Sequence, residues 1–122
     1  MNRAQLLKQT LESLMSDTED VQATALITDD GLIVASALPD QIEEARVGGM
    51  SATLLSLAAR ASRELNLGEI KQILVRGDAS YAVIQRAAEG TLLLVITAST
   101  ARLGLIFLDM NRAVVKIEKA FC

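Results

Sequence analysis

The sequence predicts an α+β domain built on a five-stranded antiparallel sheet with helices on its faces, in the order α-β-β-α-β-β-β-α. Three segments repeat apolar residues at helical spacing, and five short runs have the composition of strands. Tight turns join two of these runs before the long central helix and three after it, and strands joined so tightly must be antiparallel. The 122 residues contain no linker or internal repeat, so residues 1–122 are expected to form a single domain.

The first part of the chain predicts one helix and one β-hairpin. Residues 21–28 and 32–37 alternate or run apolar as strands do, and the Asp-Gly pair that ends at Gly31 is a strong hairpin signal because Gly accepts positive φ. The preceding helix is expected over residues 3–16. Its apolar positions follow helical spacing at Ala4, Leu7, Leu11 and Leu14.

The central helix is predicted to begin after Pro39, with Asp40 as its N-cap, and to run to about Asn66. Glu43 stands three residues after Asp40, which approaches a capping box and also suits the positive end of the helix dipole. Gly68 provides the stop signal.

Two stripes of this helix carry different side chains. The apolar stripe is expected to cover the sheet and contains Val47, Met50, Leu54, Leu57, Ala58, Ala61 and Leu65. The other stripe consists of small residues, and we call it the small-residue stripe. It includes two glycines, and each glycine inside a helix costs about 1 kcal/mol relative to Ala. Close packing against a second copy of the helix would explain that cost, and a kinked helix with a featureless outer face is the alternative. The predicted dimer contact on the helix comprises Gly48, Gly49, Ala52, Ser56 and Ala59.

Three further strands follow, over residues 70–76, 80–86 and about 91–97. The last of them is continuously apolar, which indicates a central strand covered on both faces. The first also has apolar residues on both faces, and at a sheet edge it would need protection by a second chain. Ile73 and Val75 therefore join the predicted dimer contact.

A last helix closes the chain. Either Ser99 or Thr100 could cap it, and apolar residues recur at helical spacing from Leu103 to the end. Lys116 and Lys119 fall near its C-terminus, where the helix dipole favours cations.

The inventory of residues argues against catalysis. No histidine is present, which removes the commonest general base and metal ligand. No Gly-Lys-Ser/Thr of a phosphate-binding loop occurs either, so the chain is not itself a GTPase. We expect no catalytic residue, no metal and no cofactor. The single cysteine, Cys122, cannot form an internal disulfide, and this favours a reducing cytoplasm.

Composition also argues against two kinds of partner. One Tyr, two Phe and no Trp leave almost no stacking surface, and a net charge of −3 disfavours nucleic acid. The most apolar stretch, residues 92–108, is interrupted by polar side chains and falls short of the roughly 20 apolar residues of a membrane span. We therefore expect neither nucleic-acid binding nor membrane insertion.

Charge is unevenly distributed along the chain. Residues 1–44 carry nine acids and two bases, whereas residues 45–122 carry six acids and ten bases. This asymmetry could create two faces of opposite sign, although an ordinary solvated surface also explains it. Arg46, Arg60 and Arg63 on the central helix are candidate contacts for an acidic partner protein, with a solvated helix face as the alternative reading.

The order of elements resembles the Roadblock/dynein light chain family over essentially the whole chain. Residues 25–36, Ala-Leu-Ile-Thr-Asp-Asp-Gly-Leu-Ile-Val-Ala-Ser, resemble the first hairpin of that family, with its Asp-Gly turn before the second strand. The small-residue helix from Gly48 to Ala61 resembles its central helix. Residues 91–105 resemble its last strand and the start of its last helix.

The resemblance implies a homodimer in which the central helices lie side by side and the third strands join into one sheet. It also implies a role in regulating or scaffolding Ras-like small GTPases, similar to that of the gliding-motility GTPase-activating partner. The family has no shared catalytic residues, so none is carried over. A structural scaffold subunit of a larger complex and, from another class, a small-ligand sensor are the competing readings.

Overall fold

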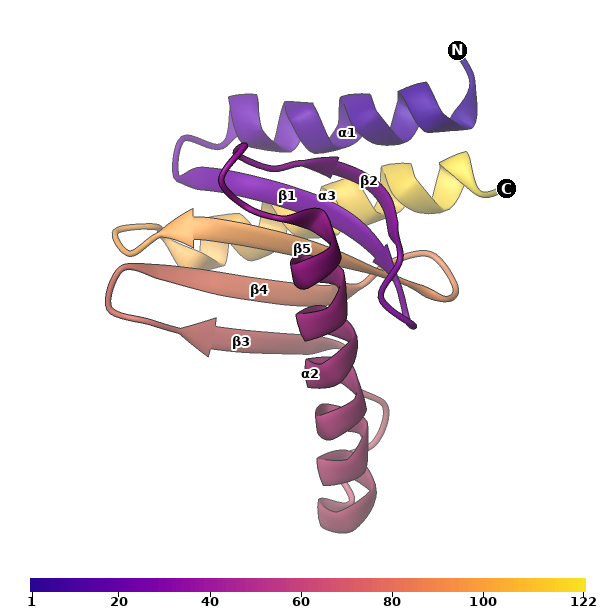
Figure 1. Cartoon of the computed structure of the whole chain (residues 1–122), viewed down its shortest axis with the longest axis vertical. Coiled ribbons are helices and arrows are strands. Elements are labelled where there is room, and N and C mark those ends of the chain that lie inside the picture. The colour runs from indigo at the N-terminus through magenta and orange to yellow at the C-terminus, as the bar shows by residue number, and fades with distance from the viewer.

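Figure 1 shows the computed structural model of the chain, which describes all residues from 1 to 122. The predicted order of elements is confirmed. The elements are α1 (Arg3–Asp17), β1 (Val21–Thr28), β2 (Ile33–Ala37), α2 (Glu44–Leu65), β3 (Gln72–Arg76), β4 (Ser80–Arg86), β5 (Thr91–Ala98) and α3 (Leu103–Ala120). None of the three helices combines the length and the apolarity that a membrane span requires.

The five strands form one antiparallel sheet in the order β2-β1-β5-β4-β3. β5 lies at the centre, as its continuous apolar sequence predicted. Leu92 and Leu94 are buried on one face of the sheet, and Leu93 and Val95 on the other. β3 lies at one edge of the sheet, the position at which its apolar residues would need protection by a second chain, and β2 lies at the other edge.

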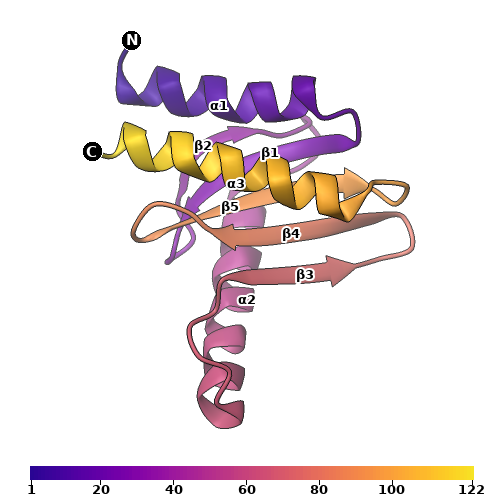
Figure 2. The ribbon, with the colours of Figure 1, turned by 180° about the vertical axis from the view of Figure 1, so that it is seen from behind.

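α1 and α3 cover one face of the sheet, and Figure 2 shows them side by side in opposite directions. Their apolar stripes meet the inward side chains of β1, β4 and β5 in a core of 15 buried residues. Leu11 and Met110 are fully buried there, one on each helix. We call this the α1–α3 face.

α2 alone covers the opposite side, which we call the α2 face. The core beneath it contains only six buried residues, among them Ile27, Val47 and Ile84. α2 crosses the strands and continues past the edge of β3, so that its last turns have no sheet beneath them (Figures 1 and 2). One helix thus leaves the α2 face half covered.

Two of the predicted helix starts are wrong. Asp40 does not cap α2: residues 39–42 form a separate turn in which Ile42 N–H donates to the Pro39 carbonyl, and the helix begins only at Glu44. Glu43 occupies the N-cap position without a side-chain hydrogen bond, so the capping box is absent.

α3 likewise begins later than predicted. Ala101 N–H donates to the Ala98 carbonyl, which places Ser99 and Thr100 in a turn and leaves Arg102 as the N-cap. The complete capping box of the chain is at α1 instead, where Asn2 and Gln5 each accept the other's backbone N–H, at 2.8 and 3.0 Å. At the other end of α2, Asn66 adopts the left-handed conformation one residue after the helix ends at Leu65, close to the predicted end.

The path of α2 depends on a contact between two backbones. Gly48 is buried against Gly31 in the turn between β1 and β2, and a Cβ atom at Gly48 would lie 2.0 Å from the Gly31 carbonyl oxygen. Gly31 itself has φ of +95°, which favours glycine. Gly49, the next residue, has open space around it. The cost of Gly48 in a helix is therefore offset by a contact within the chain.

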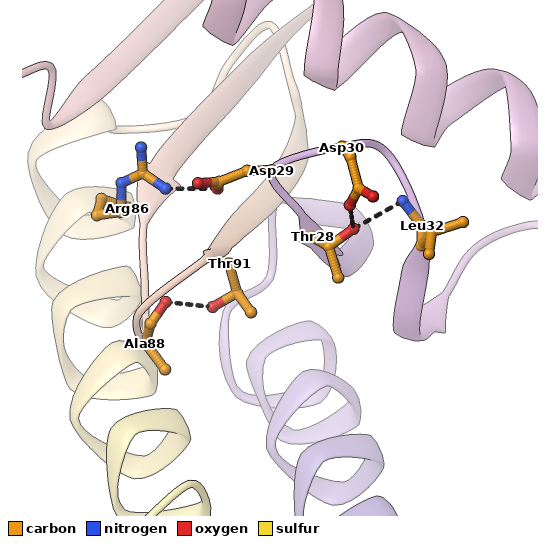
Figure 3. A network of polar contacts seen from close by, with 7 residues as sticks. All are labelled: Thr28, Asp29, Asp30, Leu32, Arg86, Ala88 and Thr91. Carbon is orange, nitrogen blue, oxygen red and sulfur yellow. Dashed lines mark hydrogen bonds and ion pairs between the residues drawn. The ribbon is translucent and has the colours of Figure 1, made fainter.

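Side-chain bonds hold this turn in place (Figure 3). The Thr28 hydroxyl donates to Asp30 at 2.5 Å and accepts from Leu32 N–H at 2.9 Å. Asp29 accepts from Arg86, at the end of β4, at 2.5 Å. Because β4 and the turn are far apart in sequence, this ion pair fastens the turn to the sheet and so fixes the surface on which α2 rests.

The adjacent glycines of α2 predict opposite responses to one substitution. Gly48→Ala should lower the free energy of unfolding by about 2 kcal/mol, because its methyl group meets the Gly31 backbone, which cannot move cheaply. Gly49→Ala should raise it by about 0.5–1 kcal/mol through helix propensity alone. Urea unfolding of both variants at one protein concentration measures the difference, and equal effects would contradict the contact.

The Asp29–Arg86 pair predicts a measurable but small coupling. Both side chains are partly exposed, so a double-mutant cycle with Asp29→Asn and Arg86→Gln should give a coupling free energy of about 0.5 kcal/mol. The coupling should shrink at high ionic strength because salt screens exposed charges. Additive effects of the two substitutions at low salt would show that the pair does not hold the turn.

Candidate functional site

The open edge of β3 is the first part of the candidate site. Arg86 N–H donates to the Lys71 carbonyl and Gly77 N–H donates to the Ser80 carbonyl. In an antiparallel ladder, alternate residues between these two points bond to β4. The backbone groups of Gln72, Leu74 and Arg76 therefore point away from the sheet, where no strand follows. Such an edge can pair with another strand.

Apolar side chains surround this edge on both faces. Ile73 and Val75 lie on the α2 face, opposite Ile84 and Ala82 of β4, and Val75 is 43% exposed. Leu74, on the other face, is 44% exposed. The edge carries charged side chains only at its ends, so little in the strand itself prevents pairing.

The outer flank of α2 is the second part. Met50 and Leu57 lie two helical turns apart on the same side and are 54% and 63% exposed. The adjoining Leu54 is half-buried over the sheet. In Figure 1 strands β3 and β4 extend to one side of α2, and the β1–β2 turn lies on the other side. Gly48 faces that turn, and at 100° per residue Met50 and Leu57 lie roughly opposite Gly48 on the helix. The outer flank of α2 and the open edge of β3 thus form one continuous apolar surface.

The structure corrects which residues of α2 meet the sheet. Val47 is buried against the sheet as predicted, and Leu54 packs beside it. Met50, Leu57 and Leu65 were also expected to cover the sheet but are exposed, and Gly48, Ser51 and Ser62 are buried in their place. The reason is geometric. The Gly31–Gly48 contact rotates the small-residue stripe toward the chain's own β1–β2 turn, and the last turns of the helix extend beyond β3.

The small-residue stripe consequently faces its own chain. Ala52, Ser56 and Ala59 line a cleft of about 390 Å³ between α2 and the segment that leads into β3. Asp29 and Arg86 form part of the same lining. Gly48 is enclosed by Gly31, whereas Gly49 has open space around it and Ser56 is exposed at the mouth of the cleft.

The three candidate arginines do not form one cluster. Arg46 is exposed on the first turn of α2, and the 14 residues that separate it from Arg60 span roughly 21 Å of helix. Arg60 pairs with Glu64 at 3.2 Å, and both side chains are largely exposed. Arg63 lines the cleft beside the small-residue stripe.

Sequence reasoning missed Met50 and Leu57 as surface residues. A signal was present for the later part of the helix: the apolar stripe from Val47 to Leu65 spans roughly 27 Å of helix, whereas the outer strands of a five-stranded sheet lie roughly 19 Å apart. No group of three His, Cys, Asp or Glu side chains converges as a metal site would require. The open strand edge and the exposed apolar flank of α2 are features suited to contact with another chain.

Comparisons with known proteins agree with this architecture. The sequence is 32% identical over 107 residues to the uncharacterized protein MJ1340 of Methanocaldococcus jannaschii, covering 88% of this chain and 93% of that protein. Among solved structures, a Roadblock/LC7 domain from Streptomyces avermitilis superposes with a TM-score of 0.87 at 19% identity, covering 93% of this chain and 96% of that one. MglB of Myxococcus xanthus superposes with a TM-score of 0.89 at 18% identity, covering 97% and 89%.

The family comparison covers most of the chain. Residues 7–97 match the Roadblock/LC7 domain, from α1 through β5. This match, the element order and the sheet topology confirm the resemblance drawn from the sequence. The chain belongs to the Roadblock/LC7 domain family.

Proposed function

We propose that this chain is the protomer of a non-catalytic homodimer that binds and regulates a Ras-like small GTPase. The observation that carries the dimer is the half-covered α2 face. Six residues are buried there, against 15 on the α1–α3 face, while Ile73, Ile96 and Leu54 remain half-buried around them. A second copy would bury what one helix leaves exposed, and burial of apolar surface is the main driving force of association.

A two-fold axis beside β3 satisfies both parts of the site. Near Leu74 it pairs the outward backbone groups of Gln72 in one copy with those of Arg76 in the other. The same operation carries the projecting half of each α2 over the neighbouring sheet, antiparallel to the other helix. Met50, Leu54 and Leu57 would then lie between the helices, above Ile73 and Val75. Such an interface is self-complementary, as in most homodimers.

This arrangement revises the helix contacts but keeps those of the strand. Ile73 and Val75 stay in the proposed interface. On the helix, the exposed flank at Met50 and Leu57 replaces the small-residue stripe, because Gly48 is already buried within its own chain.

The proposal that the partner is a small GTPase rests on the family to which the chain belongs. The resemblance implies a regulator or scaffold of Ras-like GTPases, and MglB is among the similar structures, one of them described as MglB in a tetrameric arrangement. With no phosphate-binding loop of its own, the chain would act on a partner that hydrolyses the nucleotide. Arg46, Arg60 and Arg63 lie on exposed positions of α2 and are the proposed contacts.

The dimer predicts a change of mass. Wild-type protein should have about twice the 13.1 kDa of one chain in light scattering, and Leu57→Arg should have the mass of a monomer because it places a charge between the helices. Leu105→Arg is the matched control: Leu105 is 54% exposed on α3, outside the interface, and its variant should remain a dimer. A wild-type protein that is monomeric at a concentration of tens of micromolar would contradict the proposed dimer.

The GTPase role predicts binding that depends on α2. A Ras-like GTPase from the same genome, loaded with GDP or a non-hydrolysable GTP analogue, should bind the wild-type dimer in calorimetry. Arg60→Glu with Arg63→Glu should weaken that binding by about tenfold or more. The mass of this double variant should stay that of a dimer. A GTPase that binds in neither nucleotide state would leave the structural scaffold as the better reading.

A further inference from the structure

The groove between α1 and α3 lies on the face that the proposed dimer leaves open. Two adjoining depressions of about 330 and 410 Å³ share Thr10, Ser13 and Lys116, so they form one continuous groove along the pair of helices. Figure 2 shows the two helices running alongside each other over this length. We call this feature the α1–α3 groove.

The α3 side of the groove combines cations with exposed apolar residues. Arg112, Lys116 and Lys119 line it. Lys116 and Lys119 have no carboxylate within 4.0 Å, whereas Arg112 lies 3.8 Å from Asp109, which also accepts from Thr18 at 2.7 Å. The solvent-exposed surface of the same helix carries three large apolar side chains that are 45–54% exposed: Leu105, Leu108 and Val115.

The α1 side of the groove is almost free of charge. Gln9, Thr10 and Ser13 are polar and uncharged, and Leu6 is 40% exposed beside them. Asp17, at the end nearest Asp109, is the one acidic residue of this wall. The groove is therefore concave. Its α3 wall carries three cations and one acid, Asp109, and its α1 wall carries Asp17 alone, with apolar residues beside both.

We propose that the α1–α3 groove receives an acidic amphipathic helix from a partner protein. A third helix fits a groove between two packed helices through the ordinary interlocking of side-chain ridges. Its carboxylates would meet Lys116, Lys119 and Arg112, and its apolar stripe would cover Leu105 and Leu6. This site is independent of the GTPase and of the α2 face.

A flat anionic membrane fits this surface less well. A plane cannot enter a concave groove, and the cations of α3 line that groove. Exposed Glu12 and Asp17 on α1 belong to the same layer and would be repelled, as would a chain of net charge −3.

Nuclear magnetic resonance titration of the full chain tests the proposal. The probe is an 18-residue helical peptide with Leu on one stripe and Glu beside it. Its control has Lys at every Glu position. The acidic peptide should give saturable amide shifts confined to α1 and α3, and the basic peptide should not. No saturable shift, or equal binding of the two peptides, would overturn the proposal.

Two variants and one further probe sharpen the test. Lys116→Glu with Lys119→Glu should weaken the acidic peptide about tenfold, since two attractions become repulsions. Arg46→Glu with Arg60→Glu changes the net charge equally on the opposite face and should leave the affinity unchanged. Equal weakening by both pairs would mean that net charge alone matters, which contradicts a site. Phosphatidylcholine vesicles with phosphatidylserine should not bind, and vesicle binding without peptide binding would assign the groove to lipid instead.

Discussion

Gly48 of α2 touches Gly31 of the β1–β2 turn, backbone against backbone, and the placement of α2 depends on this contact. Since a Cβ atom at Gly48 would stand 2.0 Å from the Gly31 carbonyl oxygen, only glycine lets the helix settle so close to the turn. The turn is itself held by Thr28, Asp30 and the Asp29–Arg86 ion pair. From this anchor α2 crosses the sheet and leaves it beyond β3, so the exposed flank of the helix and the open strand edge lie together.

The two faces of the sheet consequently have different roles. The α1–α3 face is closed by two helices over a large aliphatic core, and its outer surface presents a charged groove. The α2 face has a small core, and the apolar residues around that core are only partly buried. Apolar surface that is left in water favours association, which is why the proposed self-association belongs to the α2 face. The proposed partner of the α1–α3 face is instead selected by its charge.

Local patterns in the sequence were sufficient for the fold. The Asp-Gly turn, the continuous apolar run of β5 and the helical spacing of α1 each predicted their element, because each depends on neighbours in the chain. The orientation of α2 could not be predicted in this way. Its apolar stripe fits a sheet on one side equally well whether Gly48 faces a second helix or the Gly31 backbone, and only the tertiary contact decides. The start of α2 was misplaced for a related reason: Pro39 and Ile42 use the apparent capping segment for a turn.

Hydrogen exchange at the edge of β3 tests the central claim most directly. The Leu74 amide points away from β4 and should exchange as freely as a surface amide in a monomer, whereas pairing with a second β3 would protect it. Protection at Leu74 should rise with protein concentration in step with dimer formation, while the Ile73 amide, already bonded within the sheet, should change far less. A dimer in which Leu74 exchanges freely at every concentration would contradict the pairing of the two edges.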